Sequence, residues 1–93
     1  MPDERIDKAK AFVRDRAHAY QTAFPKEGAA TKAVLDDLAV FCRAHDSTFH
    51  PDPRIAAQLD GRREVYLRIM EHLTFTSDEL WLRYAAGVKK GAT

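Results

Sequence analysis

The chain has a single cysteine, Cys42, and almost no net charge. One cysteine excludes a framework of intrachain disulfides and a cysteine-rich zinc site, so we expect a reducing compartment. The 15 lysines and arginines nearly balance the 14 aspartates and glutamates, which leaves a formal net charge of +1. This balance gives no reason to expect strong nonspecific attraction to DNA or to an anionic membrane.

Long hydrophobic runs are also missing. The chain has no stretch of about 18 consecutive apolar residues, the length that a transmembrane helix needs. Its first ten residues, MPDERIDKAK, are rich in charge and lack the hydrophobic region of a signal peptide. We therefore expect a soluble protein of the cytoplasmic type, with no membrane partner.

What the sequence does contain is a globular balance, with 45% hydrophobic and 31% charged residues, and apolar side chains at helical spacing. Ninety-three residues provide one modest core. The predicted fold class is all-α, a small single-domain bundle of about four helices with short loops. This domain spans 1–88, and 89–93 is expected to be a frayed tail. The helices are predicted at 3–23, 29–44, 53 to 72 or 73, and 77 to about 88.

Two helix starts are marked by local residues. Asp52 followed by Pro53 is typical of an N-cap with proline at the first helical position, where proline loses no helical hydrogen bond. Thr76 and Glu79 have the spacing of a capping box, and Phe75 can pack on Leu80 across it.

The loop before Pro53 contains His45, Asp46, His50 and Asp52, all of which can bind a metal. One hypothesis is a zinc or manganese site that activates water for hydrolysis. However, the spacing matches no established ligand motif, and Asp52 is already needed as a cap. Ordinary polarity of a surface loop is the favoured interpretation, so neither a metal nor another cofactor is predicted.

Catalysis by a nucleophile is also disfavoured. Cys42 lies on the apolar stripe of its helix, where cysteine usually serves as a small core residue rather than as an activated thiolate. The sequence has no nucleophile elbow, phosphate-binding glycine loop or dinucleotide fingerprint. The chain is therefore predicted not to be an enzyme.

Two arginines of the third helix fall within or beside its apolar arc: Arg63 inside it, and Arg62 at its edge. A guanidinium in that position must reach solvent or find a carboxylate. Asp36, Asp37 and Asp52 are the candidate partners for an internal ion pair. The alternative is that these arginines meet an acidic patch on another subunit, or a phosphate.

Gly61 interrupts the same helix, at a cost of about 1 kcal/mol relative to alanine. Glycine there would let another helix or chain approach closely, and crowding inside the domain would explain it equally well. Binding of nucleic acid through the arginines of this helix is the weaker hypothesis, because acidic residues interleave with them. These arginines are Arg54, Arg62, Arg63 and Arg68.

The segment FCRAHDSTFHPDPRIAAQLDGRREVYLRIM, residues 41–70, resembles the Bbp19-like phage domain, a family of small tailed-phage and prophage proteins. The resemblance lies in a Phe-Cys pair that ends a helix, an aromatic residue before PDPR, and the stretch GRREVYLRI. The residues that carry it are Phe41, Cys42, Phe49, Asp52, Pro53, Arg54, Gly61, Arg62, Arg63 and Leu67 to Ile69.

This resemblance implies a phage-encoded helical protein of the head or tail morphogenesis region, with no established enzymatic activity. The predicted function is therefore that of a virion-associated or assembly protein. It would contact copies of itself or other phage structural proteins through helical faces, in the host cytoplasm and in the virion. The alternative is a nucleic-acid-associated module used in packaging or ejection.

Overall fold

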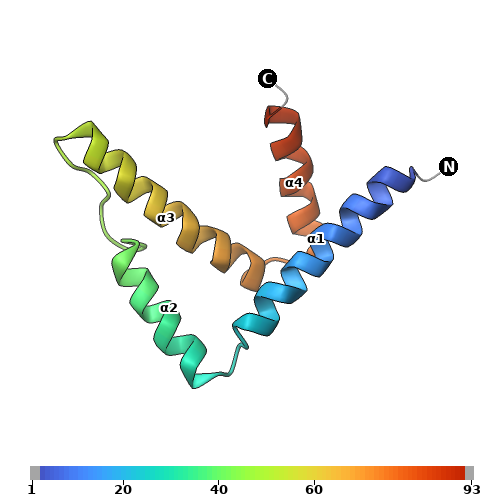
Figure 1. Ribbon diagram of the computed structural model, residues 1–93, viewed down its shortest axis with the longest axis horizontal. Helices are drawn as coiled ribbons and strands as arrows, with labels where there is room; N and C mark the ends of the chain where they lie inside the picture. Colours follow the sequence, from blue (N-terminus) through green and yellow to red (C-terminus); the bar gives the residue numbers. More distant parts are fainter. Residues whose placement is uncertain (1–2, 92–93) are drawn as a thin grey trace. The chain divides into compact units, whose positions relative to one another are not determined.

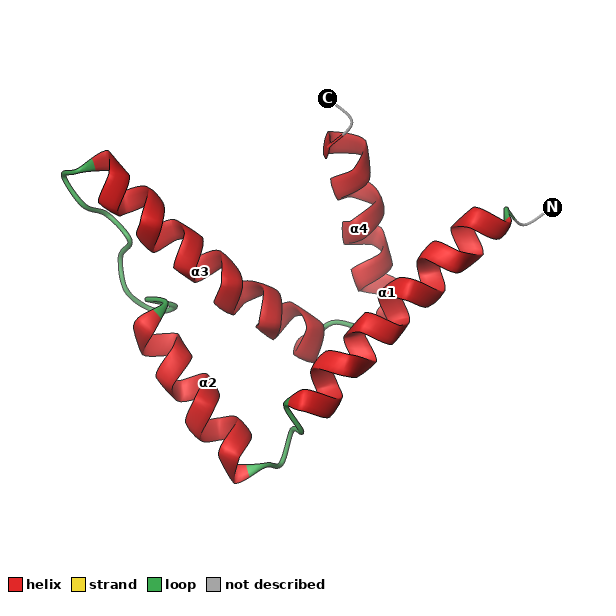
Figure 2. Cartoon of the chain, in the orientation of Figure 1, coloured by secondary structure: helices red, strands yellow, loops and turns green. Residues whose placement is uncertain are grey.

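The computed structural model describes residues 3–91, with side chains as far as Gly87, and within this range it contains helices and loops but no strand (Figure 2). The predicted all-α fold with four helices is confirmed. No helix in the described range combines the length and the apolar character needed to cross a bilayer. The four helices follow one another along the chain as α1 (Glu4–Ala23), α2 (Ala29–Phe41), α3 (Pro53–Thr74) and α4 (Ser77–Gly91) (Figure 1).

The chain divides into two compact units. The α2/α3 unit is Phe24–Met70, which contains α2 and most of α3. The α1/α4 unit contains α1, α4 and the residues from Glu71 onward that lead from the end of α3 into α4. Helix α4 continues to Gly91, so it includes residues 89–91, which the sequence places in a frayed tail. Residues 92–93 of that predicted tail lie outside the described residues.

The core of the α1/α4 unit lies where α4 packs on α1. Its buried residues are Val13 and Ala17 of α1 and Leu80 of α4. Three partly buried aromatic residues pack against this cluster: Phe75, Trp81 and Tyr84. Phe75 thus packs against the cluster that contains Leu80, its predicted partner.

The capping box of α4 is also confirmed. The backbone N–H of Thr76 donates to Oε1 of Glu79 at 3.0 Å, and the backbone N–H of Glu79 donates to Oγ1 of Thr76 at 3.2 Å. The hydrogen bonds from the backbone and the hydroxyl of Thr76 lower the pKa of Glu79. The two residues therefore satisfy two backbone donors at the start of the helix.

Helix α2 ends at Phe41, three residues before the predicted end at Ala44. Arg43 has a left-handed backbone, with φ of 51°. Its N–H donates to the carbonyl of Val40 at 3.1 Å, and the N–H of Ala44 donates to the carbonyl of Ala39 at 2.9 Å. This is the hydrogen-bond pattern of a Schellman motif, in which glycine is the usual left-handed residue. The prediction was wrong because an arginine occupies that position, so no glycine marks the helix end.

Candidate protein-docking site

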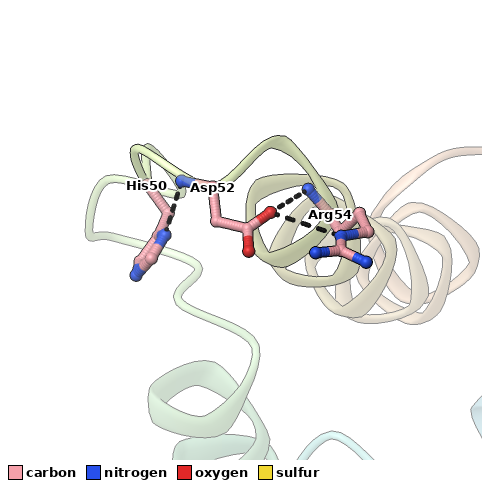
Figure 3. Close-up of polar contacts among 3 residues, drawn as sticks. All are labelled: His50, Asp52 and Arg54. Carbon is pink, nitrogen blue, oxygen red and sulfur yellow. Dashed lines mark hydrogen bonds and ion pairs between the residues drawn. The ribbon is translucent and has the colours of Figure 1, made fainter.

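The start of α3 is built by three residues of the HPDPR segment (Figure 3). Nδ1 of His50 accepts a hydrogen bond from the backbone N–H of Asp52 at 3.0 Å. Oδ1 of Asp52 accepts from the backbone N–H of Arg54 at 2.9 Å and lies 3.7 Å from Nε of the same arginine. The carbonyl of Asp52 accepts the first helical bonds, so Asp52 acts as the predicted N-cap ahead of Pro53.

The residues of the metal hypothesis are not gathered into a site. His45 and Asp46 are exposed, while His50 and Asp52 are committed to the helix start through the bond described above. Within the described residues, no group of three or more His, Cys, Asp or Glu side chains is arranged to hold a metal ion. This corner is organised around backbone hydrogen bonds.

Arg62 lies over an aromatic ring. Its guanidinium carbon is 4.4 Å from the centre of the Phe41 ring, which brings the end of α2 against the middle of α3. Such a cation–π contact is worth about 0.5–1 kcal/mol at an exposed site and more when it is shielded from water. Arg62 is half-buried, and Phe41 remains 56% exposed. The partner of Arg62 within the fold is therefore a ring.

None of the three aspartates proposed as ion-pair partners forms an ion pair with Arg62 or Arg63. Asp36 binds Lys32, with Nζ and Oδ2 2.6 Å apart, and the hydrogen bond raises the pKa of Lys32. Asp52 binds Arg54, as described. Asp37 is exposed and makes no ion pair or hydrogen bond with the described residues. Arg63 likewise makes no ion pair or hydrogen bond with the described residues, although its side chain is half-buried.

Two further predicted residues lie on the outside of α3. Arg68 is exposed on the helix surface. Gly61 is also exposed, and no described atom lies within 4 Å of where its β-carbon would be. Crowding within the fold, one of the two explanations for this glycine, is thus not found, and close approach by another chain stays a prediction.

The contact between Arg62 and Phe41 joins one flank of α3 to one flank of α2 within the α2/α3 unit. Residues three, four or seven positions apart lie on the same side of a helix. The flank of α2 that carries Phe41 therefore also carries Val34 and Asp37, and the flank of α3 that carries Arg62 also carries residues 55, 65 and 69. We call this surface the Phe41 face, and its residues are Val34, Asp37, Phe41, Ile55, Arg62, Val65 and Ile69.

The Phe41 face leaves large apolar side chains in contact with solvent. Val34, Phe41, Ile55 and Val65 are all exposed, and Val65 is the most exposed of them at 59%. In contrast, the buried apolar residues described in this unit are two, Leu59 and the predicted core residue Cys42. An exposed apolar surface is typical of a site that binds another protein.

A buried histidine was missed by the sequence analysis. His72 is 2% exposed and stacks on Tyr20, with ring centres 4.3 Å apart and planes 19° from parallel. Its backbone carbonyl accepts a hydrogen bond from Nε2 of Gln21 at 3.2 Å. These contacts join the end of α1 to the end of α3 inside the α1/α4 unit. No local signal marks them, because the partners lie about fifty residues apart in the sequence.

The α1/α4 unit has an apolar recess of its own. It has a volume of about 360 Å³ and lies between the first half of α1 and the body of α4. Trp81 and Tyr84 line it from α4, while Ile6 and Ala9 line it from α1. An ion pair between Asp3 and Arg5, 3.5 Å apart, lies at its edge. The recess contains no cluster of catalytic or metal-binding groups.

Comparison with known proteins confirms the resemblance described above. The family model described as Bbp19-like phage protein matches residues 20–86 of the chain. The matched region extends from the end of α1 through α2 and α3 and into α4, so it contains the whole Phe41 face. No curated protein matches the chain, and no solved structure does.

Proposed function

The chain belongs to the Bbp19-like phage protein family, and on that premise we propose that it takes part in assembly of the phage particle through helix-mediated contacts with other proteins. It does so without catalysing a reaction. It acts as a component of the virion or as a factor that is present during head or tail morphogenesis. Its partners are phage structural proteins or copies of itself.

The observation that carries this proposal is the exposed apolar surface of the Phe41 face. Four large apolar side chains on two helices are exposed to solvent there, beside a guanidinium that lies over an aromatic ring. A central aromatic anchor with an arginine is a combination that is enriched at binding hot spots. The face lies entirely within the segment that matches the family.

Binding to nucleic acid is the weaker alternative. Arg54 lies against the carboxylate of Asp52, which competes with a phosphate for its guanidinium. Asp60 and Glu64 are exposed on the same helix, and acidic side chains there would oppose a polyanion. We would expect any such binding to weaken steeply as the salt concentration rises.

The proposal is tested by removing the protein from a phage that encodes it. Particles are purified from cells infected with the parent phage and with a deletion mutant, and their proteins are identified by mass spectrometry. We expect the deletion to stop the production of infectious particles at a defined stage, visible as incomplete heads or tails by electron microscopy. Unchanged yield, morphology and protein composition would refute the proposed function.

A further inference from the structure

We propose that the Phe41 face is a self-association surface, which docks on the Phe41 face of a second copy of the chain across a two-fold axis. This inference rests on the proposed function and names the first partner of the same surface. It follows from the apolar content of the face, from its two opposite charges and from its size.

The apolar content provides the driving force. Phe41 and Val65 each expose more than half of their surface, and Val34 and Ile55 are also exposed. Removing apolar surface from water is favourable at roughly 25 cal/mol per Å². In a two-fold dimer the same patch is present on both partners, so the apolar surface of each copy is available to cover that of the other.

The charges of the face are complementary to themselves. Asp37 lies on the α2 flank and makes no ion pair with any described residue, while Arg62 lies on the α3 flank over Phe41. When two such faces meet across a two-fold axis, α2 of one copy can lie opposite α3 of the other. Arg62 of each copy then meets Asp37 of the other copy, which gives two symmetric ion pairs and leaves no like charges opposed.

This arrangement also explains why Arg62 has no carboxylate partner among the described residues. A guanidinium on a ring keeps its edge available, and its five N–H donors suit a carboxylate that approaches from outside. The ring beneath it fixes the direction of that edge, which reduces the entropy that is lost on binding.

The size of the face predicts how strong the dimer is. The α2 flank of the face belongs to a helix of 13 residues, which corresponds to a length of about 20 Å. A pair of faces with this footprint lies at the low end of specific interfaces. We therefore expect a dimer that dissociates in the micromolar range.

The test uses the full chain in sedimentation equilibrium at concentrations from about 1 µM to about 1 mM, a range that brackets the expected dissociation constant. We expect a reversible monomer–dimer equilibrium. Asp37→Arg places like charges opposite each other and should weaken the dimer tenfold or more. The matched control is Asp60→Arg, which makes the same change of charge on the other flank of α3 and should leave the dimer intact.

A second pair of measurements distinguishes loss of the interface from misfolding of a variant. Asp37→Arg and Arg62→Asp should each dimerise only weakly alone, whereas an equimolar mixture should form a heterodimer, because one Arg62–Asp37 pair is kept and the other is restored with its charges exchanged. Circular dichroism checks that each variant is folded. If Arg62→Asp does not fold, Val65→Lys takes its place as a second disrupting variant on the face.

Two results would overturn the inference: a wild-type chain that stays monomeric over the whole concentration range, or a dimer that Asp37→Arg and Val65→Lys leave unaffected. The first result is expected if the Phe41 face binds another phage protein in place of a second copy of the chain. Either result leaves the proposed function standing if deletion of the gene still blocks particle assembly. Conversely, the chain can form a dimer with the expected sensitivity while the phage assembles normally after deletion of the gene. That combination would refute only the proposed function.

Discussion

Leu80 is the side chain whose truncation we expect to weaken the α1/α4 unit most. It is 5% exposed and belongs to the buried cluster that also contains Val13 and Ala17, so Leu80→Ala removes most of the α4 contribution to a very small core. Truncation of a buried leucine to alanine costs about 2–5 kcal/mol, depending on how far the surroundings collapse into the space.

The structure favours the lower half of that range. Phe75, Trp81 and Tyr84 are only partly buried, so they are free to move toward the space that Leu80 leaves. We therefore expect a loss of about 2–3 kcal/mol. A chain of 93 residues has a total stability of about 5–14 kcal/mol, so the variant should remain folded but with a much reduced margin.

The assay is urea unfolding followed by tryptophan fluorescence. Trp81 is the one tryptophan of the chain and packs against the core in question, so its emission reports on the α1/α4 unit. With an m-value of about 1 kcal/mol per M, the midpoint should fall by about 2–3 M.

Leu82→Ala is the matched control, because the same change is made two residues further along α4. Leu82 is 68% exposed, and truncation of an exposed side chain changes stability by about 0.5 kcal/mol or less. If both variants lower the midpoint equally, Leu80 is not in the core and the packing of α4 on α1 described here is wrong.

Three further changes have predicted outcomes in the same unfolding assay, followed by circular dichroism. Because the bonds from Thr76 lower the pKa of Glu79 below its ordinary value of 4.5, Glu79 stabilises the fold above that pH, and this stabilisation should fade as the pH falls through the lowered pKa. The stability difference between wild type and Glu79→Gln should therefore shrink on acidification. Arg43→Gly should raise stability by about 0.5–1 kcal/mol, because glycine adopts the left-handed conformation without strain. Gly61→Ala should raise the helix stability by about 1 kcal/mol, because nothing occupies the space that the new methyl group enters.

For each variant, the opposite result would contradict a specific feature described above. A Glu79→Gln difference that persists unchanged to low pH would mean that the capping box does not form in solution. Destabilisation by Arg43→Gly would mean that the bond from Nη1 of Arg43 to the carbonyl of Ser47, 3.4 Å long, outweighs the backbone strain. Destabilisation by Gly61→Ala would mean that another chain packs against that position.

The elements that could be predicted from the sequence are those whose causes lie within a few residues. The N-cap Asp52, the proline after it and the Thr76–Glu79 capping box all act through hydrogen bonds between near neighbours, and each is present as predicted. The end of α2 was predicted too late, because Arg43 adopts a conformation that only its surroundings can impose.

The partners of side chains between helices could not be predicted in this way. A helical wheel shows that Arg62 lies beside an apolar arc, but not which residue of α2 it meets. That residue is Phe41 rather than an aspartate. The stacking of Tyr20 on His72 is a second example, because it depends on where two distant helix ends come together.

The burial of Cys42 makes the chain's own thiol a probe of local opening. At 4% exposure the sulfur is shielded from reagents while the α2/α3 unit is closed, so a thiol reagent can modify it only during transient opening. The rate of modification under native conditions thus measures how often this unit opens, with no label introduced. Because Cys42 directly follows Phe41, any protein that covers the Phe41 face should slow this reaction, which offers a simple screen for the natural binding partners of the protein.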